Sequence, residues 1–131
     1  MTSPNYPNDY PSDVELTQTI VVPKGNIVTL KFTHFTLEQE YSPRVDYVVV
    51  TDGDGTRLAK FHGGSSDWKF EIVSHTETVA VNFVTDGSVN RRGWRLEWGE
   101  GSIEMVAYYL PSFCRYFYLL SFCRHVQPLW R

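Results

Sequence analysis

Residues 78–83, Thr-Val-Ala-Val-Asn-Phe, decide the fold class of this chain. Every second position in this run is apolar, at Val79, Val81 and Phe83, and small or polar residues fill the alternate positions. Successive side chains of a strand point to opposite faces, so a period of two predicts a strand with one buried face and one face toward water.

The same period recurs on both sides of this run, over residues 28–33, 68–73 and 94–98. Residues 47–50, Tyr-Val-Val-Val, are apolar on both faces, as expected of a central strand. Turn-forming residues separate the runs, at positions 23–26, 52–55, 62–65 and 86–88. Short strands at roughly ten-residue spacing, with no amphipathic helix before residue 100, predict an all-β antiparallel β-sandwich.

Composition limits what the 131-residue chain can be. It is long enough for one compact core, and its hydrophobic content of 42% argues against disorder. The formal charge of -3 provides no broad basic surface, so we expect no nucleic-acid partner. The acidic residues concentrate in positions 1–100, which favours cations, whether metal ions or basic side chains.

We divide the chain into a β domain, residues 1–100, and a hydrophobic, aromatic C-terminal extension, residues 101–131. The extension repeats Ser-Phe-Cys-Arg at 112–115 and 121–124. Pro111, Arg115 and Arg124 interrupt it, so it falls short of the ~18 uncharged apolar residues of a membrane span. We expect it to pack on the sandwich as strands or a helix. Cys114 and Cys123 pair within a hairpin, join two chains in a homodimer, or stay reduced.

Several short motifs in residues 3–98 resemble those of CUB domains, most closely the first CUB domain of the serine proteases that start the complement cascade. They follow the family's order: Ser3-Pro4-Asn5-Tyr6-Pro7 with Tyr10-Pro11, Ile20-Val21-Val22-Pro23, Phe32-Thr33-His34-Phe35-Thr36-Leu37-Glu38, Asp46-Tyr47-Val48, Thr85-Asp86 with Ser88, and Gly93-Trp94. The resemblance implies a CUB-like jelly-roll that binds proteins and is not an enzyme. It also implies a secreted, extracellular protein.

The cysteine pattern departs from this family. Leu16, Pro43 and His62 stand where the family has half-cystines, and the two cysteines of this chain lie in the extension. The loss of a native disulfide typically costs ~2–5 kcal/mol in a small domain, which the core of a chain of this length can offset. The absence of body cysteines alone favours a reducing compartment, and no apolar leader precedes Ser3. Either the chain stays inside the cell or it is a mature piece.

Three acidic residues lie where strands are expected to end: Glu38, Asp46 and Asp86. The loop between Glu38 and Asp46 is short, so we expect a hairpin to bring these two carboxylates to one end of the sandwich. Asp86 follows the 78–83 strand. Calcium takes six to eight hard oxygen ligands, so such a group of carboxylates is a candidate calcium site.

The resemblance gives this site its residues. It implies that Glu38, Asp46, Asp86 and Ser88 bind Ca²⁺, with Tyr10 and Asn90 in support. In the family an asparagine directly follows the serine; here Val89 does, and Asn90 comes one place later.

The resemblance also implies a partner. A calcium-ordered loop would present Glu38, Asp46 and Asp86 to a lysine of a collagen-like stem or another extracellular protein. We expect nearby contacts from three further residues, His34, Phe35 and Tyr41. The alternative is a metal-independent module that binds carbohydrate or glycosaminoglycan, which the basic pair Arg91-Arg92 favours.

Two other patterns lead to weaker hypotheses. Residues 52–55, Asp-Gly-Asp-Gly, begin like an EF-hand loop, but the twelfth position is Gly63 where such a loop needs glutamate, so we expect a β-turn. Residues 62–67 contain the letters of a hydrolase triad without a nucleophile elbow. The four histidines show no zinc spacing.

Overall fold

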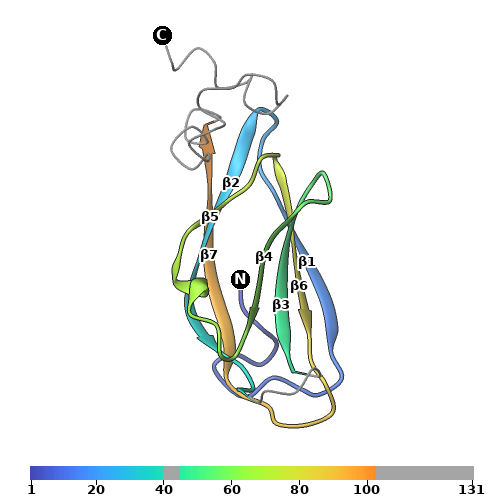
Figure 1. Cartoon of the computed structure of the whole chain (residues 1–131). Coiled ribbons are helices and arrows are strands. Elements are labelled where there is room, and N and C mark those ends of the chain that lie inside the picture. Colours follow the sequence, from blue (N-terminus) through green and yellow to red (C-terminus); the bar gives the residue numbers. More distant parts are fainter. Residues whose placement is uncertain (40–44, 103–131) are drawn as a thin grey trace.

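The computed structural model describes residues 1–39 and 45–102 and folds them into strands (Figure 1). The strands are β1 (Glu15–Val21), β2 (Asn26–Thr36), β3 (Tyr47–Asp52), β4 (Arg57–His62), β5 (Ile72–Val73), β6 (Thr78–Val84) and β7 (Gly93–Ser102). A short 3-10 helix, η1 (Asp67–Lys69), lies between β4 and β5. No helix in the described part is long and apolar enough to cross a bilayer.

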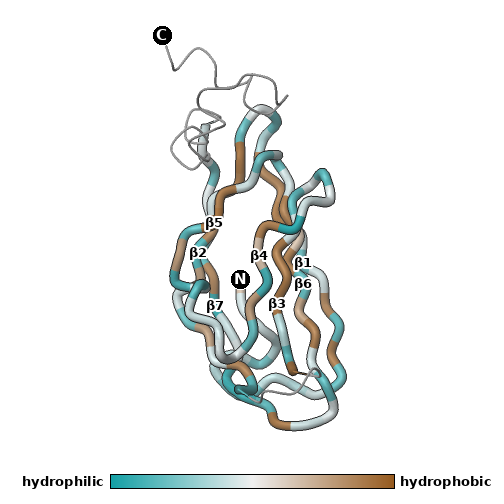
Figure 2. The backbone as a smooth tube through the Cα atoms, in the orientation of Figure 1, coloured by the Kyte–Doolittle hydropathy of each residue, from teal (hydrophilic) through white to brown (hydrophobic). Residues whose placement is uncertain are grey.

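The strands form two antiparallel sheets, which confirms the predicted all-β sandwich. One sheet has the order β1-β6-β3-β4 and the other β5-β2-β7. Strand β3 lies between β6 and β4, as its apolar residues on both faces predicted. Figure 2 shows hydrophobic residues along the strands and mainly hydrophilic residues in the loops at the two ends.

The core lies between the two sheets and is rich in aromatic rings. Phe32 of β2 meets Phe61 of β4 edge-on, with ring centroids 5.7 Å apart, and Phe83 of β6 meets Trp94 of β7 in the same way at 5.9 Å. All four side chains are buried. Edge-to-face pairs add about 0.5–1.5 kcal/mol each beyond the burial of apolar area, so these contacts join the two sheets firmly.

Residues 68–73 differ from the predicted strand. The turn around Ser66–Phe70 forms η1, so only Ile72 and Val73 pair with β2. Trp68 stacks on Phe35 at 5.9 Å instead of occupying a sheet position, and Phe70 is 69% exposed. The apolar residues of this run therefore do not share one strand: Trp68 lies in η1 and Ile72 in β5.

The N-terminal residues extend the second sheet. Thr2 forms a bridge with Arg95 of β7, and the Ser3 N–H donates to the Trp94 carbonyl at 2.9 Å. The chain then turns across one end of the sandwich, where the Tyr10 N–H donates to the Arg91 carbonyl at 2.9 Å. This path brings Tyr10 to the end at which β2 and β6 terminate.

Candidate functional site

The predicted acidic residues come from connections between the two sheets. Glu38 follows β2 of the three-stranded sheet, and Asp46 directly precedes β3 of the four-stranded sheet. The connection between them therefore crosses the sandwich, and the predicted hairpin is wrong. Asp86 follows β6, so all three residues still meet at one end of the molecule.

The carboxylates of Glu38, Asp46 and Asp86 form one cluster. One oxygen from each lies within 4.8 Å of the others. Glu38 is 2% exposed and Asp46 is fully buried, whereas Asp86 is partly exposed. Carboxylate oxygens are the ligands that Ca²⁺ prefers, so this donor set fits a hard divalent cation, and Asp86 is its most exposed member.

Hydrogen bonds fix the position of Asp46. The hydroxyl of buried Tyr10 donates to Asp46 Oδ2 at 2.5 Å, and the Asp86 N–H donates to Asp46 Oδ1 at 2.8 Å. The Tyr10 hydroxyl also accepts from the Glu38 N–H at 3.3 Å. Tyr10 therefore contacts two residues of the cluster.

The electrostatics of the cluster favour a bound cation. Burial raises the pKa of Asp46, the charge of Asp86 raises it further, and the hydrogen bonds from Tyr10 and the Asp86 N–H oppose this rise. Burial also raises the pKa of Tyr10, as do its hydrogen bond to Asp46 and the negative charge there. A divalent cation would offset the cost of holding buried negative charges together.

The turn after Asp86 has a strained backbone. Asp86 Oδ1 accepts from the Ser88 N–H at 2.9 Å and from its hydroxyl at 3.5 Å. Val89 has a φ of 54°, which is unfavourable for a β-branched residue. The described contact of the Asn90 side chain is with Ser12 rather than with the acids: its nitrogen donates to the Ser12 hydroxyl at 3.1 Å.

The three expected partner contacts have different surroundings. His34 lies on β2, where its Nε2 is 3.4 Å from the Thr36 hydroxyl and its ring is 5.5 Å from Tyr6. Phe35 is 8% exposed and packs in the core against Trp68. Tyr41 lies outside the described residues, as do residues 103–131 of the extension with its two cysteines; residues 101 and 102 end β7.

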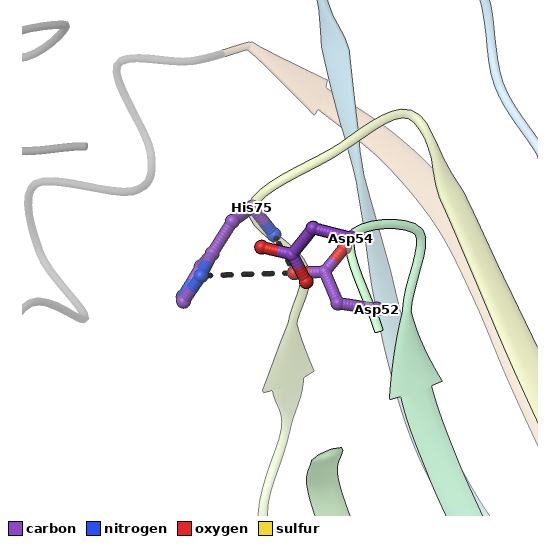
Figure 3. A group of neighbouring side chains, drawn as sticks. All are labelled: Asp52, Asp54 and His75. Atoms are coloured by element: carbon purple, nitrogen blue, oxygen red, sulfur yellow. Dashed lines mark hydrogen bonds and ion pairs between the residues drawn. The ribbon is translucent and has the colours of Figure 1, made fainter. Parts of the chain in front are cut away.

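A second acidic group lies in the turn between β3 and β4, near the start of β6 (Figure 3). It contains Asp52, Asp54 and His75, whose potential ligand atoms lie within 4.8 Å of one another. Buried Asp52 accepts from the Thr76 hydroxyl at 2.6 Å and the His75 N–H at 2.7 Å, and it lies 3.6 Å from the His75 ring. Through these bonds, Asp52 links the turn after β3 to the turn before β6.

The Asp-Gly-Asp-Gly segment forms the expected turn. The Gly55 N–H donates to the Asp52 carbonyl at 3.0 Å, which closes a four-residue turn. The Thr56 N–H donates to Asp54 Oδ1 at 2.9 Å, and this bond lowers the pKa of Asp54 more than any other interaction. The buried role of Asp52 was not predicted from sequence.

Gly63 is a further residue that the sequence prediction missed. A Cβ atom at this position would lie 2.5 Å from the Leu37 carbonyl oxygen and would overlap the Glu38 carbonyl. Only glycine lets the turn after β4 approach the backbone of Glu38 so closely. The Gly63-Gly64 pair was the available signal, but a glycine pair equally indicates an ordinary turn.

Comparison with known proteins identifies relatives of this chain. A family model described as the CUB domain matches residues 1–98. Mannan-binding lectin serine protease 1 of Rattus norvegicus is 51% identical over 61 residues, which cover 47% of this chain and 8% of that protein. The chain spans from 3% to 23% of the length of eight similar curated proteins.

Two solved structures extend the comparison to three dimensions. The CUB1-EGF-CUB2 region of human MASP-1/3 matches with a TM-score of 0.71 and 30% identity, over 86% of this chain and 44% of that one. The MASP-1 CUB2 domain bound to Ca²⁺ matches with a TM-score of 0.65 and 33% identity, over 75% of this chain and 88% of that one.

Proposed function

This chain belongs to the CUB domain family, and on that premise we propose that it is a non-catalytic module that binds proteins in a calcium-dependent manner. Glu38, Asp46 and Asp86 are the anionic calcium ligands in this proposal, and Ser88 provides a neutral oxygen. Tyr10 supports the acids directly, and Asn90 supports the turn through Ser12. The similarity to a Ca²⁺-bound MASP-1 CUB domain favours this metal.

The observation that carries the proposal is the convergence of three carboxylates from both sheets within 4.8 Å. Two of these side chains are buried, and ordinary turn acids face water instead. The ion pairs between described residues involve neither Asp46 nor Asp86. A bound calcium ion would therefore offset the negative charges of Asp46 and Asp86.

The partner in this proposal presents a lysine side chain. A calcium ion would hold the three carboxylates in place and leave outward lone pairs on the oxygens of Asp86, the partly exposed member of the cluster. An ammonium group would then form charge-assisted hydrogen bonds to these oxygens, which are stronger than hydrogen bonds between neutral groups. Because the contact is electrostatic, its affinity should fall as salt rises. A collagen-like stem of an extracellular protein would suit this surface, and we place the chain outside the cell.

The first prediction tests the metal. Calcium at 100 times its Kd should stabilise the wild type by about 2.7 kcal/mol relative to chelator. Asp46→Ala should remove this gain, because it deletes a central ligand. Asp54→Ala should keep it, because it removes the same charge from another turn. Thermal melting with and without calcium measures the gain, and an unchanged wild-type melting temperature in millimolar calcium would exclude the proposal.

Binding to a collagen-like peptide with one lysine per strand tests the partner. Calcium should be required, and replacement of the lysine by norleucine should abolish binding. Binding that persists in chelator would instead favour the alternative, a metal-independent module for carbohydrate or glycosaminoglycan. Exposed Arg91 and Arg92 beside the turn would then carry the contact.

A further inference from the structure

The hydroxyl of Thr85 joins the acidic turn to the N-terminal loop. Thr85 directly precedes Asp86 and is 6% exposed. Its Oγ1 donates to the Pro11 carbonyl at 3.1 Å and accepts from the Val14 N–H at 2.8 Å. The Thr85 N–H donates to the Val14 carbonyl at 2.8 Å. One side chain thus holds both ends of the Pro11–Val14 segment.

The same loop reaches the carboxylate cluster at two other points. The Asp13 N–H donates to the Asp86 carbonyl at 2.9 Å. Tyr10, which directly precedes Pro11, donates its hydroxyl to Asp46. Asp46 in turn accepts from the Asp86 N–H. Hydrogen bonds and the chain itself therefore connect Thr85, through the N-terminal loop, to both aspartates.

We infer that Thr85 is a positioning residue for the metal site, acting through the Pro11–Val14 segment on Tyr10 and Asp86. This inference rests on the proposed function. Without the hydroxyl, the Val14 N–H and the Pro11 carbonyl lose a shared partner, and only the backbone hydrogen bonds between Thr85 and Val14 and between Asp13 and Asp86 still attach the loop beside Asp86. Residues that orient metal ligands typically contribute about 10- to 100-fold to metal affinity.

Thr76 provides a matched control for this inference. Its hydroxyl also makes several contacts: Oγ1 lies 2.6 Å from Asp52 Oδ1 and 2.9 Å from the Thr78 carbonyl, either of which can accept its single proton, and it accepts from the Gly53 N–H at 3.1 Å. Thr76 contacts Asp52 of the second acidic group, not the predicted calcium site. Thr76→Val therefore removes a hydroxyl of comparable bonding from a position that does not contact the calcium ligands.

The second prediction compares full-length Thr85→Val, Thr85→Ser and Thr76→Val. Calorimetric titration with CaCl₂ should give a Kd about tenfold higher for Thr85→Val. Thr85→Ser should return the Kd to within about threefold of the wild type, because it keeps the hydroxyl. Thr76→Val should lower the melting temperature in chelator and leave the calcium Kd unchanged.

Amide hydrogen exchange in chelator tests the same inference without metal. Thr85→Val should speed exchange at Asp13, Val14 and Asp86, and Thr76→Val should not. A wild-type calcium Kd and wild-type exchange in Thr85→Val would overturn the inference, as would equal loss of calcium affinity in both valine variants. Absence of calcium binding by the wild type would overturn the proposed function, and the exchange rates would still report on the role of Thr85 in positioning Asp86.

Discussion

Val89 occupies a backbone conformation that suits few residues. Its φ of 54° lies in the left-handed region, which costs an L-residue roughly 1–2 kcal/mol and a β-branched residue more. Asparagine enters this region readily, and in the resembled CUB domains an asparagine follows the serine of the acidic turn. Valine therefore lacks both a suitable backbone preference and a ligand oxygen at this position.

The third prediction separates these two deficits. Val89→Gly should raise the free energy of unfolding in chelator by about 1 kcal/mol, because glycine adopts positive φ without strain. Val89→Asn should stabilise the protein by a similar amount and also lower the calcium Kd. Chemical denaturation and calorimetric titration measure the two effects. Equal calcium affinities for the glycine and asparagine variants would show that position 89 adds no ligand.

At the residue scale, the sequence pattern drew attention to the three clustered acids but not to the residues that contact them. Glu38, Asp46 and Asp86 stand out because charged residues follow or precede apolar alternation at strand ends. Tyr10 came only from family resemblance. Nothing in local sequence indicates that the Thr85 hydroxyl reaches Pro11 or that Gly63 contacts Glu38, because these contacts join residues more than 20 positions apart.

At the element scale, alternation located four strands but did not indicate β1 or β4, and it does not show which strands pair. The runs at 28–33, 47–50, 78–83 and 94–98 all became strands. The pairing of β1 with β6, however, joins residues about 60 positions apart, and the path from β2 to β3 changes sheets. The error at 68–73 has a similar cause, because Trp68 finds its partner in Phe35 outside the sheet ladder.

The fourth prediction concerns the contact between the turn after β4 and the backbone after β2. Gly63→Ala should destabilise the protein by about 1–3 kcal/mol, because the new methyl group meets rigid carbonyl oxygens of Leu37 and Glu38. It should also raise the calcium Kd, because Glu38 must shift. Melting and calcium titration provide both measurements.

Gly64→Ala is the control for this contact. Its Cβ would lie 3.2 Å from the movable His62 ring, so both quantities should stay close to those of the wild type. If the two alanine variants behaved alike, Gly63 would have no special role in placing Glu38.

At the scale of the whole molecule, the two acidic groups lie at opposite ends of β3. Asp46 precedes its first residue and Asp52 is its last, so roughly 20 Å of extended chain separates them. The core between them contains no disulfide: Leu16 pairs with Phe83 in the β1–β6 ladder, and His62 ends β4. The described residues contain no cysteine, so aromatic packing and buried hydrogen bonds hold this part of the chain together without a disulfide.

The fifth prediction tests whether the two ends act independently. Asp52→Ala should lower the free energy of unfolding by about 3 kcal/mol, because it leaves the His75 N–H and the Thr76 hydroxyl without a charged acceptor. The calcium Kd should change less than twofold. Denaturation in chelator and calorimetry measure these quantities, and a large loss of calcium affinity would reveal coupling along β3.

The burial of Glu38 and Asp46 would affect how long a metal ion stays bound as well as how tightly it binds. An ion coordinated by these two side chains would have little direct access to water. Its departure would need the surrounding loops to open, and loop motions take nanoseconds to microseconds or longer. The lifetime of the charged surface would then be set by the motion of the protein rather than by diffusion of the ion.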